Sequence, residues 1–249
     1  MRWLPLALLV LLTSGCFGRS ANECSPCAVP TDVTAQPPTV VPVVTPPDLN
    51  DSGYVMTQPW HVGDGWDYQS NQSAFRTVRV LREALTPGHR LLLIEETEGV
   101  VGNPPKIRYQ SWIDGDTLAR YNLTYIGGRM SLGFDPAEPR LRFLRNGTFS
   151  YNETTFLDGN PSSKSVVRAN AHFAGYQQVR LGWGNMEAAR MEFRFLTTTS
   201  DGASTRELEL HWAQRDYGAD VQYELPTSER FFLTAVKYGD VTRGKLAGT

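Results

Sequence analysis

The sequence contains little cysteine and histidine, and it has no excess of charge that would favour one class of partner. It has three cysteines, and its formal net charge at pH 7 is -2. A chain without a basic excess lacks the charge pattern typical of nucleic-acid-binding proteins. No two histidines have the spacing of a metal site, because the four stand singly, at His61, His89, His172 and His211. We therefore expect no nucleic acid, metal or other cofactor as a partner.

Catalytic motifs with a fixed local spacing are also missing. The sequence has no Gly-x-Ser-x-Gly nucleophile motif and no glycine-rich phosphate loop before a helix. Two carboxylates across a cleft could serve a glycosidase, but the acidic stretch around Glu95, Glu96 and Glu98 is more typical of a solvated strand edge. We expect His89, in a turn, and His211, on a polar strand face, to be solvated. A protein without enzymatic activity is predicted, with a carboxylate-based hydrolase as the weaker alternative.

No apolar run is long enough to cross a membrane. The longest follows a single arginine and covers about ten residues at positions 3–12, and small residues then lead to Cys16. A run of about ten residues is typical of a signal peptide, whereas a bilayer core of about 30 Å needs about twenty. The segment resembles a lipoprotein signal, so residues 1–15 are predicted to be a lipoprotein signal peptide and Cys16 the lipid anchor. Ordinary cleavage near Gly15 or Gly18, which would leave a secreted soluble protein, is the alternative.

The remaining cysteines and a proline-rich segment fit an extracytoplasmic protein. With Cys16 acylated, Cys24 and Cys27 are left as a pair, and an oxidising compartment favours a disulfide between them. A redox-active Cys-x-x-Cys normally opens a helix, and no helix pattern follows this one. Residues 16–52 are rich in Pro and Thr, which favours an extended tether. We therefore expect a domain on the cell membrane, at the cell surface or in the periplasm, held through the Cys16 lipid.

The rest of the chain has the alternation typical of β-strands. Segments rich in Val, Ile, Thr, Phe and Tyr recur over residues 53–240, and Gly, Pro, Asn and Asp divide them. The pairs Asp114-Gly115, Asn146-Gly147 and Asp201-Gly202 favour tight hairpin turns. No window of helical length has a 3.6-residue period with caps.

Short hairpin connections make an antiparallel meander, because parallel strands need long crossovers. About ten strands would bend, and one face of each is expected to be wetted. We therefore predict an all-β fold: a single strongly curved antiparallel meander sheet, either a half-barrel or an open barrel, over residues 53–240. Residues 241–249 are predicted to be a flexible tail.

Three stretches are similar to a known group of exported domains. Residues 62–68 (VGDGWDY) are like its G-D-x-W-x-Y opening, and residues 181–192 (LGWGNMEAARME) are like its glycine turn followed by a strand. Residues 212–223 (WAQRDYGADVQY) are similar to its closing W-Y-…-G-x-V-x-Y element. In order and spacing the chain resembles the TapB-like group of surface lipoproteins. The resemblance implies an exported lipoprotein with a half-barrel fold akin to lipoprotein carriers, and it supplies no catalytic residues.

Tryptophans are the candidate ligand-binding residues. They either pack in the core or line an apolar cleft on the concave side, since curved sheets often hold apolar guests there. We predict a binding domain for an apolar or amphiphilic small molecule, or for a protein partner, in the concave face. The alternative is a structural or interaction protein of the cell envelope. The candidate cleft residues are Trp66, Trp112, Trp183 and Trp212.

Four Asn-x-Ser/Thr triplets are candidate glycosylation sites. They fall on predicted turns or polar strand faces, where a glycan would be tolerated. The acceptors are Asn71, Asn122, Asn146 and Asn152.

Overall fold

The computed structural model describes most of the chain after its first 58 residues. The regular elements there are β-strands, and no helix in this part is long and apolar enough to cross a membrane. The predictions for the signal peptide, Cys16, the Cys24–Cys27 disulfide, the tether and Asn146 lie outside the described residues. The described residues are 59–116, 118–126, 131–138, 148–157, 160–214 and 217–244.

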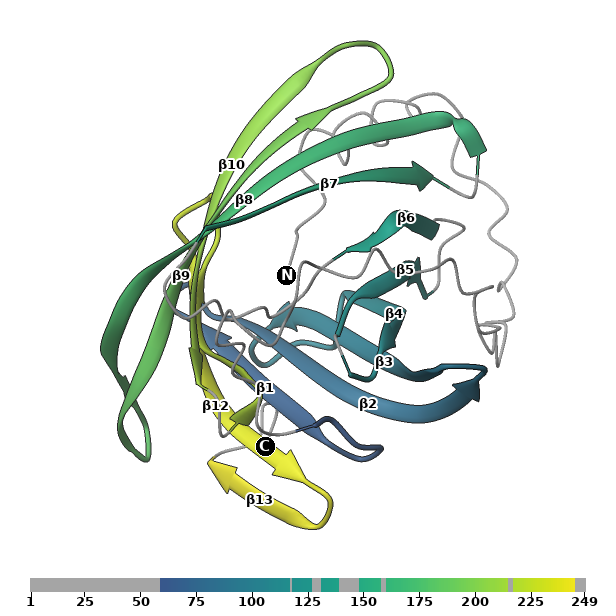
Figure 1. Ribbon diagram of the computed structural model, residues 1–249. Helices are drawn as coiled ribbons and strands as arrows, with labels where there is room; N and C mark the ends of the chain where they lie inside the picture. Colours follow the sequence, from purple (N-terminus) through teal and green to yellow (C-terminus); the bar gives the residue numbers. More distant parts are fainter. Residues whose placement is uncertain are drawn as a thin grey trace, which may run out of the picture. The chain divides into compact units, whose positions relative to one another are not determined.

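Thirteen strands form one antiparallel sheet in chain order (Figure 1), and β1 pairs with β12 as well as with β2. This confirms the predicted fold class, a single curved antiparallel meander, although the strands outnumber the ten expected. The strands are β1 (Gly65–Ser70), β2 (Ala74–Thr86), β3 (His89–Val100), β4 (Ile107–Asp114), β5 (Arg120–Tyr125), β6 (Ser131–Glu138), β7 (Thr148–Leu157), β8 (Asn160–Leu181), β9 (Gly184–Thr198), β10 (Ser204–Gln214), β11 (Ala219–Glu224), β12 (Arg230–Tyr238) and β13 (Val241–Gly244).

Contacts between strands that are not neighbours show how the sheet bends. Arg76 on β2 and Tyr223 on β11 are separated by β1 and β12, which on a flat sheet would place their strands about 14 Å apart. The guanidinium carbon of Arg76 nevertheless lies 5.9 Å from the centre of the Tyr223 ring. The Tyr68 ring on β1 is 5.4 Å from the same ring. The face that carries these three side chains is therefore the concave face of the sheet.

Aromatic side chains pack together where the chain enters β1. The Trp60 and Trp66 rings lie 4.4 Å apart. Each indole nitrogen donates a hydrogen bond to the β10–β11 connection: Trp60 Nε1 to the Gly218 carbonyl at 2.9 Å and Trp66 Nε1 to the Tyr217 carbonyl at 3.1 Å. Two buried donors are thus satisfied, and the start of the domain is fixed to a loop about 150 residues later in the chain.

The longest strand, β8, extends through Gly175. Separate strands are expected over residues 166–173 and 176–181, but a single strand covers both. Gly175 has a φ of 105°, and the register with β9 shifts between Phe173 and Gly175 without losing the pairing. A positive φ suits a glycine bulge, which bends a strand and lets it continue. The connection to β9 is only Gly182–Trp183, so β8 and β9 form one long hairpin.

The end of the described chain also differs from expectation. Residues 241–244, assigned above to a flexible tail, form β13 and pair with Ala235–Tyr238 of β12. Gly239 takes a φ of 54° in the turn between the two strands. Tight hairpin turns favour a glycine with positive φ, so the Gly239-Asp240 pair is a further hairpin signal in the sequence.

Candidate functional site

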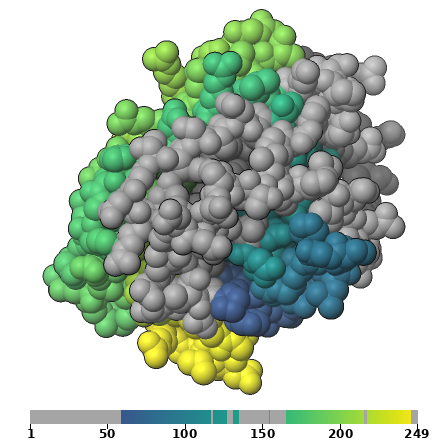
Figure 2. Space-filling view, in the orientation of Figure 1, coloured from purple at the N-terminus to yellow at the C-terminus, as the bar shows by residue number. Residues whose placement is uncertain are grey.

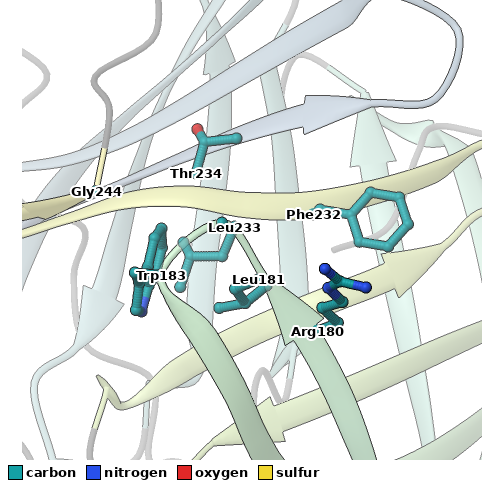
Figure 3. A pocket seen from close by; sticks show the side chains of 8 residues that line it. Arg180, Leu181, Trp183, Phe232, Leu233, Thr234 and Gly244 are labelled. Atoms are coloured by element: carbon teal, nitrogen blue, oxygen red, sulfur yellow. The ribbon is translucent and has the colours of Figure 1, made fainter.

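A pocket lies between the tip of the β8–β9 hairpin and strands β12 and β13. Its volume is about 370 Å³. Figure 3 shows Trp183 at one end and Arg180, beside Phe232, at the other. In the space-filling view the hairpin, in green at the lower left, adjoins the yellow C-terminal strands (Figure 2). The pocket is lined by Arg180, Leu181, Gly182, Trp183, Phe232, Leu233, Thr234 and Gly244.

The pocket takes residues from both faces of β12, because Phe232, Leu233 and Thr234 are consecutive. Trp212 pairs with Gln222, and Gln222 pairs with Phe232, so these three residues form a row across β10, β11 and β12. Side chains alternate along a strand, so this row faces away from His211 and Tyr223, which belong to the concave face. The pocket wall that Phe232 provides is therefore on the opposite face from the one that the sequence favoured for a ligand.

Two contacts hold the hairpin against this face. Trp212 Nε1 donates a 2.8 Å hydrogen bond to Gln177 Oε1 on β8. The Arg190 guanidinium, on β9, lies 5.8 Å from the centre of the Trp212 ring. Near the tip, Gly244 on β13 leaves no room for a side chain, since a Cβ there would lie 2.6 Å from Cζ3 of Trp183. Close packing at Gly244 thus fixes one wall of the pocket.

The surface of the pocket is mainly apolar, and its polar side chains carry hydrogen-bond donors. Leu181 and Leu233 are buried, and Trp183 and Phe232 are half-buried. Trp183 Nε1 is buried and has no acceptor among the described residues, and Arg180 is exposed and forms no ion pair with any of them. No carboxylate is among the lining residues. Such a surface suits an apolar group that also carries an acceptor or a negative charge.

The structure does not bring the four candidate tryptophans together. Trp183 lines the pocket, whereas Trp66 is 1% exposed in the aromatic cluster at the start of β1. Trp112 is fully buried, with the Arg82 guanidinium 5.0 Å from its ring centre, and Trp212 holds the hairpin. A ligand role, which stays a prediction, is therefore placed best on Trp183.

A second feature, on the concave face, is a group of buried ion pairs. Glu96 on β3 accepts hydrogen bonds from two arginines, Arg76 on β2 and Arg120 on β5, the latter at 2.9 Å. Arg76 Nε also lies 3.3 Å from Glu98 Oε1. Burial raises the pKa of Glu98, and the nearby Arg76 opposes that rise. All four side chains are buried, so each charge depends on its partners.

The group continues to a buried histidine. His211 Nδ1 lies 2.8 Å from Asp220 Oδ2, and its Nε2 lies 3.3 Å from Glu209 Oε2. Burial alone would lower the pKa of His211, but the two carboxylates outweigh it and the net shift is upward. The Tyr223 ring stacks on the His211 ring, with the two ring centres 6.1 Å apart. The Arg76 guanidinium lies 5.9 Å from the centre of the same Tyr223 ring, so Tyr223 links the histidine to the arginine–glutamate group. Burial also raises the pKa of Tyr223.

These buried charges correct three expectations from the sequence. His211 was expected to be solvated, yet it is 5% exposed and Glu209 is 1% exposed, while Leu208 on the other face is 43% exposed. Glu96 and Glu98 were expected at a wet edge and are buried. The charged face of these strands points inward because each carboxylate meets an arginine or histidine there, which offsets its desolvation.

His89 also differs from expectation. It is half-buried, and its Nδ1 lies 3.2 Å from Asp114 Oδ2 at the end of β4. His89 directly follows the Pro87-Gly88 turn between β2 and β3, and its contact with Asp114 joins the start of β3 to the end of β4. Its role in the structure is a contact between strands.

Some residues of the pocket and some of the buried ion-pair group could not be identified from the sequence. Arg180 and Phe232 at the pocket had no local motif. Arg76 carried a weak signal, because it faces the oppositely charged Glu98 directly in the β2–β3 register, and Arg120 carried none. Among the described residues, no group of three or more His, Cys, Asp and Glu side chains could hold a metal ion.

The candidate glycosylation sites have different surroundings. Asn71 is exposed in the β1–β2 turn, and its Oδ1 accepts a 3.0 Å hydrogen bond from the Arg230 amide. Asn122 is half-buried in β5, and its Oδ1 accepts a 3.0 Å bond from the Trp112 amide. Asn152 is in β7. Of Asn71 and Asn122, Asn71 is the more accessible acceptor, and its use stays a prediction.

Comparison with known proteins gives two distant structural likenesses. No family model matches the chain, so the resemblance to the TapB-like group stays a prediction, and no curated protein matches either. A candidate lipoprotein from Parabacteroides distasonis is 10% identical, with a TM-score of 0.48, over 74% of this chain and 99% of that one. A candidate exported protein with a YmcC-like fold from Bacteroides fragilis is also 10% identical, with a TM-score of 0.42 and the same coverage. At TM-scores below 0.5, neither likeness bears on the function of this chain.

Proposed function

We propose that this chain is a non-enzymatic, extracytoplasmic binding domain, anchored in the membrane by a lipid on Cys16. Its ligand is an apolar or amphiphilic small molecule that binds between the β8–β9 hairpin and β12. The observation that carries this proposal is the 370 Å³ pocket, whose walls are mainly leucine, phenylalanine and tryptophan side chains. Small-molecule sites are typically concave, mostly apolar and about 300–1,000 Å³ in volume.

The buried charges argue against the concave face as the apolar site. Glu96, Glu98 and Arg76 would each have to remain paired beside an apolar ligand. Burying a charge without its partner is strongly unfavourable, so a ligand that separated these groups would bind weakly. The pocket at β12 has no such requirement, since no carboxylate lines it.

The same pairing supports a role without catalysis. A carboxylate that acts as a general acid or nucleophile must reach a substrate in a cleft. Glu96 is instead held by two arginines, and Asp220 is held by His211. The pocket itself has no acidic lining residue.

Filling the pocket tests the proposal. We expect Phe232→Trp to lower the affinity for a neutral apolar dye such as Nile red by at least about tenfold, because the larger ring occupies the space of the ligand. The measurement is a fluorescence titration of the mature chain with Cys16→Ser, which needs no detergent. Tyr176→Trp is the matched control, since Tyr176 is on the same hairpin, is 50% exposed and does not line the pocket. Equal dye affinity in both variants would place the binding site elsewhere.

A further inference from the structure

We infer, resting on the pocket proposed above, that the ligand is a single-chain anionic amphiphile. Its negatively charged head would bind Arg180, and its apolar body would lie along Leu181, Trp183 and Phe232. Three independent features of the pocket lead to this class of ligand: the type of its polar groups, the nature of its walls and its volume.

The polar groups favour an anion over a cation. Arg180 is exposed at the pocket and forms no ion pair with a described residue, so its guanidinium is available for a charge-assisted hydrogen bond. Trp183 Nε1, which has no hydrogen-bond partner among the described residues, is also a donor. The Thr234 hydroxyl is already used, because it donates a 3.1 Å hydrogen bond to the Asp67 carbonyl. A cationic head would therefore meet a positive charge and no carboxylate.

The walls favour an apolar body next to that head. Figure 3 shows the Arg180 guanidinium close to Phe232, with Leu181 and Leu233 between Arg180 and Trp183. A chain that starts at Arg180 would follow these side chains toward the indole. Each methylene that leaves water for such a surface raises affinity roughly fourfold. The charge and the apolar contacts thus act on neighbouring parts of one ligand.

The volume sets how much of a ligand the pocket can enclose. Liquid water occupies roughly 30 Å³ per molecule, so a pocket of about 370 Å³ has room for roughly a dozen non-hydrogen atoms. Decanoate, with a carboxylate on a chain of ten carbons in all, has that size. A phospholipid with two full acyl chains is several times too large for the pocket. We therefore expect one short chain with a carboxylate or similar monoanionic head.

The test compares three ten-carbon probes on the mature chain with Cys16→Ser by calorimetry below their micellar concentrations. We expect decanoate to bind at one site at least tenfold tighter than decanol, and decyltrimethylammonium to bind weakest. Arg180→Gln should lower decanoate affinity about tenfold and leave decanol affinity unchanged, because only the charged contact is lost. Arg168→Gln is the matched control, since Arg168 is also exposed on β8 but does not line the pocket.

The outcomes separate this inference from the proposed function. If decanol binds as tightly as decanoate, or if Arg180→Gln leaves decanoate binding intact, the anionic class is wrong. The pocket proposal still stands in that case, provided that Phe232→Trp removes decanol binding. If neither the three probes nor Nile red binds, both the anionic ligand class and the pocket proposal are wrong. Arg180→Lys guards against a folding defect, because it keeps the charge and should retain most of the affinity for decanoate, with thermal melting as the check on each variant.

Discussion

Replacing Glu96 with glutamine is expected to lower the stability of the β domain by about 3–5 kcal/mol. Glu96 is the carboxylate shared by Arg76 and Arg120, and these three side chains are at most 4% exposed. The amide keeps the shape but loses the charge, so two buried guanidinium groups lose their shared counter-ion. Removing one partner of a buried pair costs about 3–5 kcal/mol, against a total stability of about 5–15 kcal/mol for a typical domain. Urea denaturation followed by tryptophan fluorescence measures the loss.

The neighbouring glutamate is the matched control for this prediction. Glu95 is on the same strand with its side chain on the opposite face, and it pairs at 2.8 Å with Arg108, whose side chain is 51% exposed. Exposed pairs contribute about 0–1 kcal/mol, so Glu95→Gln should change the free energy of unfolding by less than about 1 kcal/mol. Similar losses in the two variants would contradict a special role for the buried network.

The second large effect is a loss of stability as pH rises. The pKa of His211 is raised in the folded state, so its charged contacts stabilise the fold fully below the unfolded value of about 6.5. That contribution disappears as pH rises through the folded pKa. The pKa of Glu98 is raised too, because burial penalises its ionised form, and ionisation at higher pH therefore also destabilises the fold. Both groups lower the free energy of unfolding with rising pH, each by at most about 1.4 kcal/mol per pH unit.

Urea midpoints measured between pH 5 and pH 9 check this sign. His211→Gln removes the imidazolium, so the difference in stability from the wild type should be largest at pH 5 and should shrink as pH rises. The groups that face His211 are Asp220 and Tyr223 on β11 and Glu209 on β10, with Phe193 of β9 packed at 5.0 Å. His172→Gln is the control, since His172 is exposed on β8. A difference that stays constant or grows with pH would contradict a charged, paired His211.

The order of the strands could be predicted from the sequence because it depends on local patterns. Period-two alternation and pairs such as Asp201-Gly202 indicate hairpins, and consecutive hairpins leave few alternatives to a meander. Which face of β10 points inward could not be predicted. Alternation separates Leu208 from Glu209, but the burial of Glu209 goes with that of its partner His211, which contacts Asp220 and Tyr223 on β11. The shift in register between Trp212 and Ala213, which helps to place Asp220 next to His211, has no clear signal in the sequence.

Only part of the candidate site could be predicted from the sequence, for a similar reason. Trp183 could be named because it is a tryptophan in a glycine turn. Arg180 precedes that turn by a few residues, but Phe232 and Gly244 come about 50–60 residues later in the chain. Their meeting depends on the length of β8 and β9 and on the hydrogen bond from Trp212 to Gln177, which holds the hairpin on the convex face. Such long-range packing leaves no local pattern.

The most direct test of the proposed function is the intact mass of the protein after gentle purification from its native membrane, with extraction of any bound molecule. The wild type and the Phe232→Trp variant are compared under the same conditions. We predict a mature chain that begins at a lipidated Cys16, with a small anionic amphiphile bound to the wild type and absent from the variant. An unlipidated chain, or a wild type and variant with the same bound molecules or none, would contradict a lipid-anchored domain that binds its ligand in this pocket.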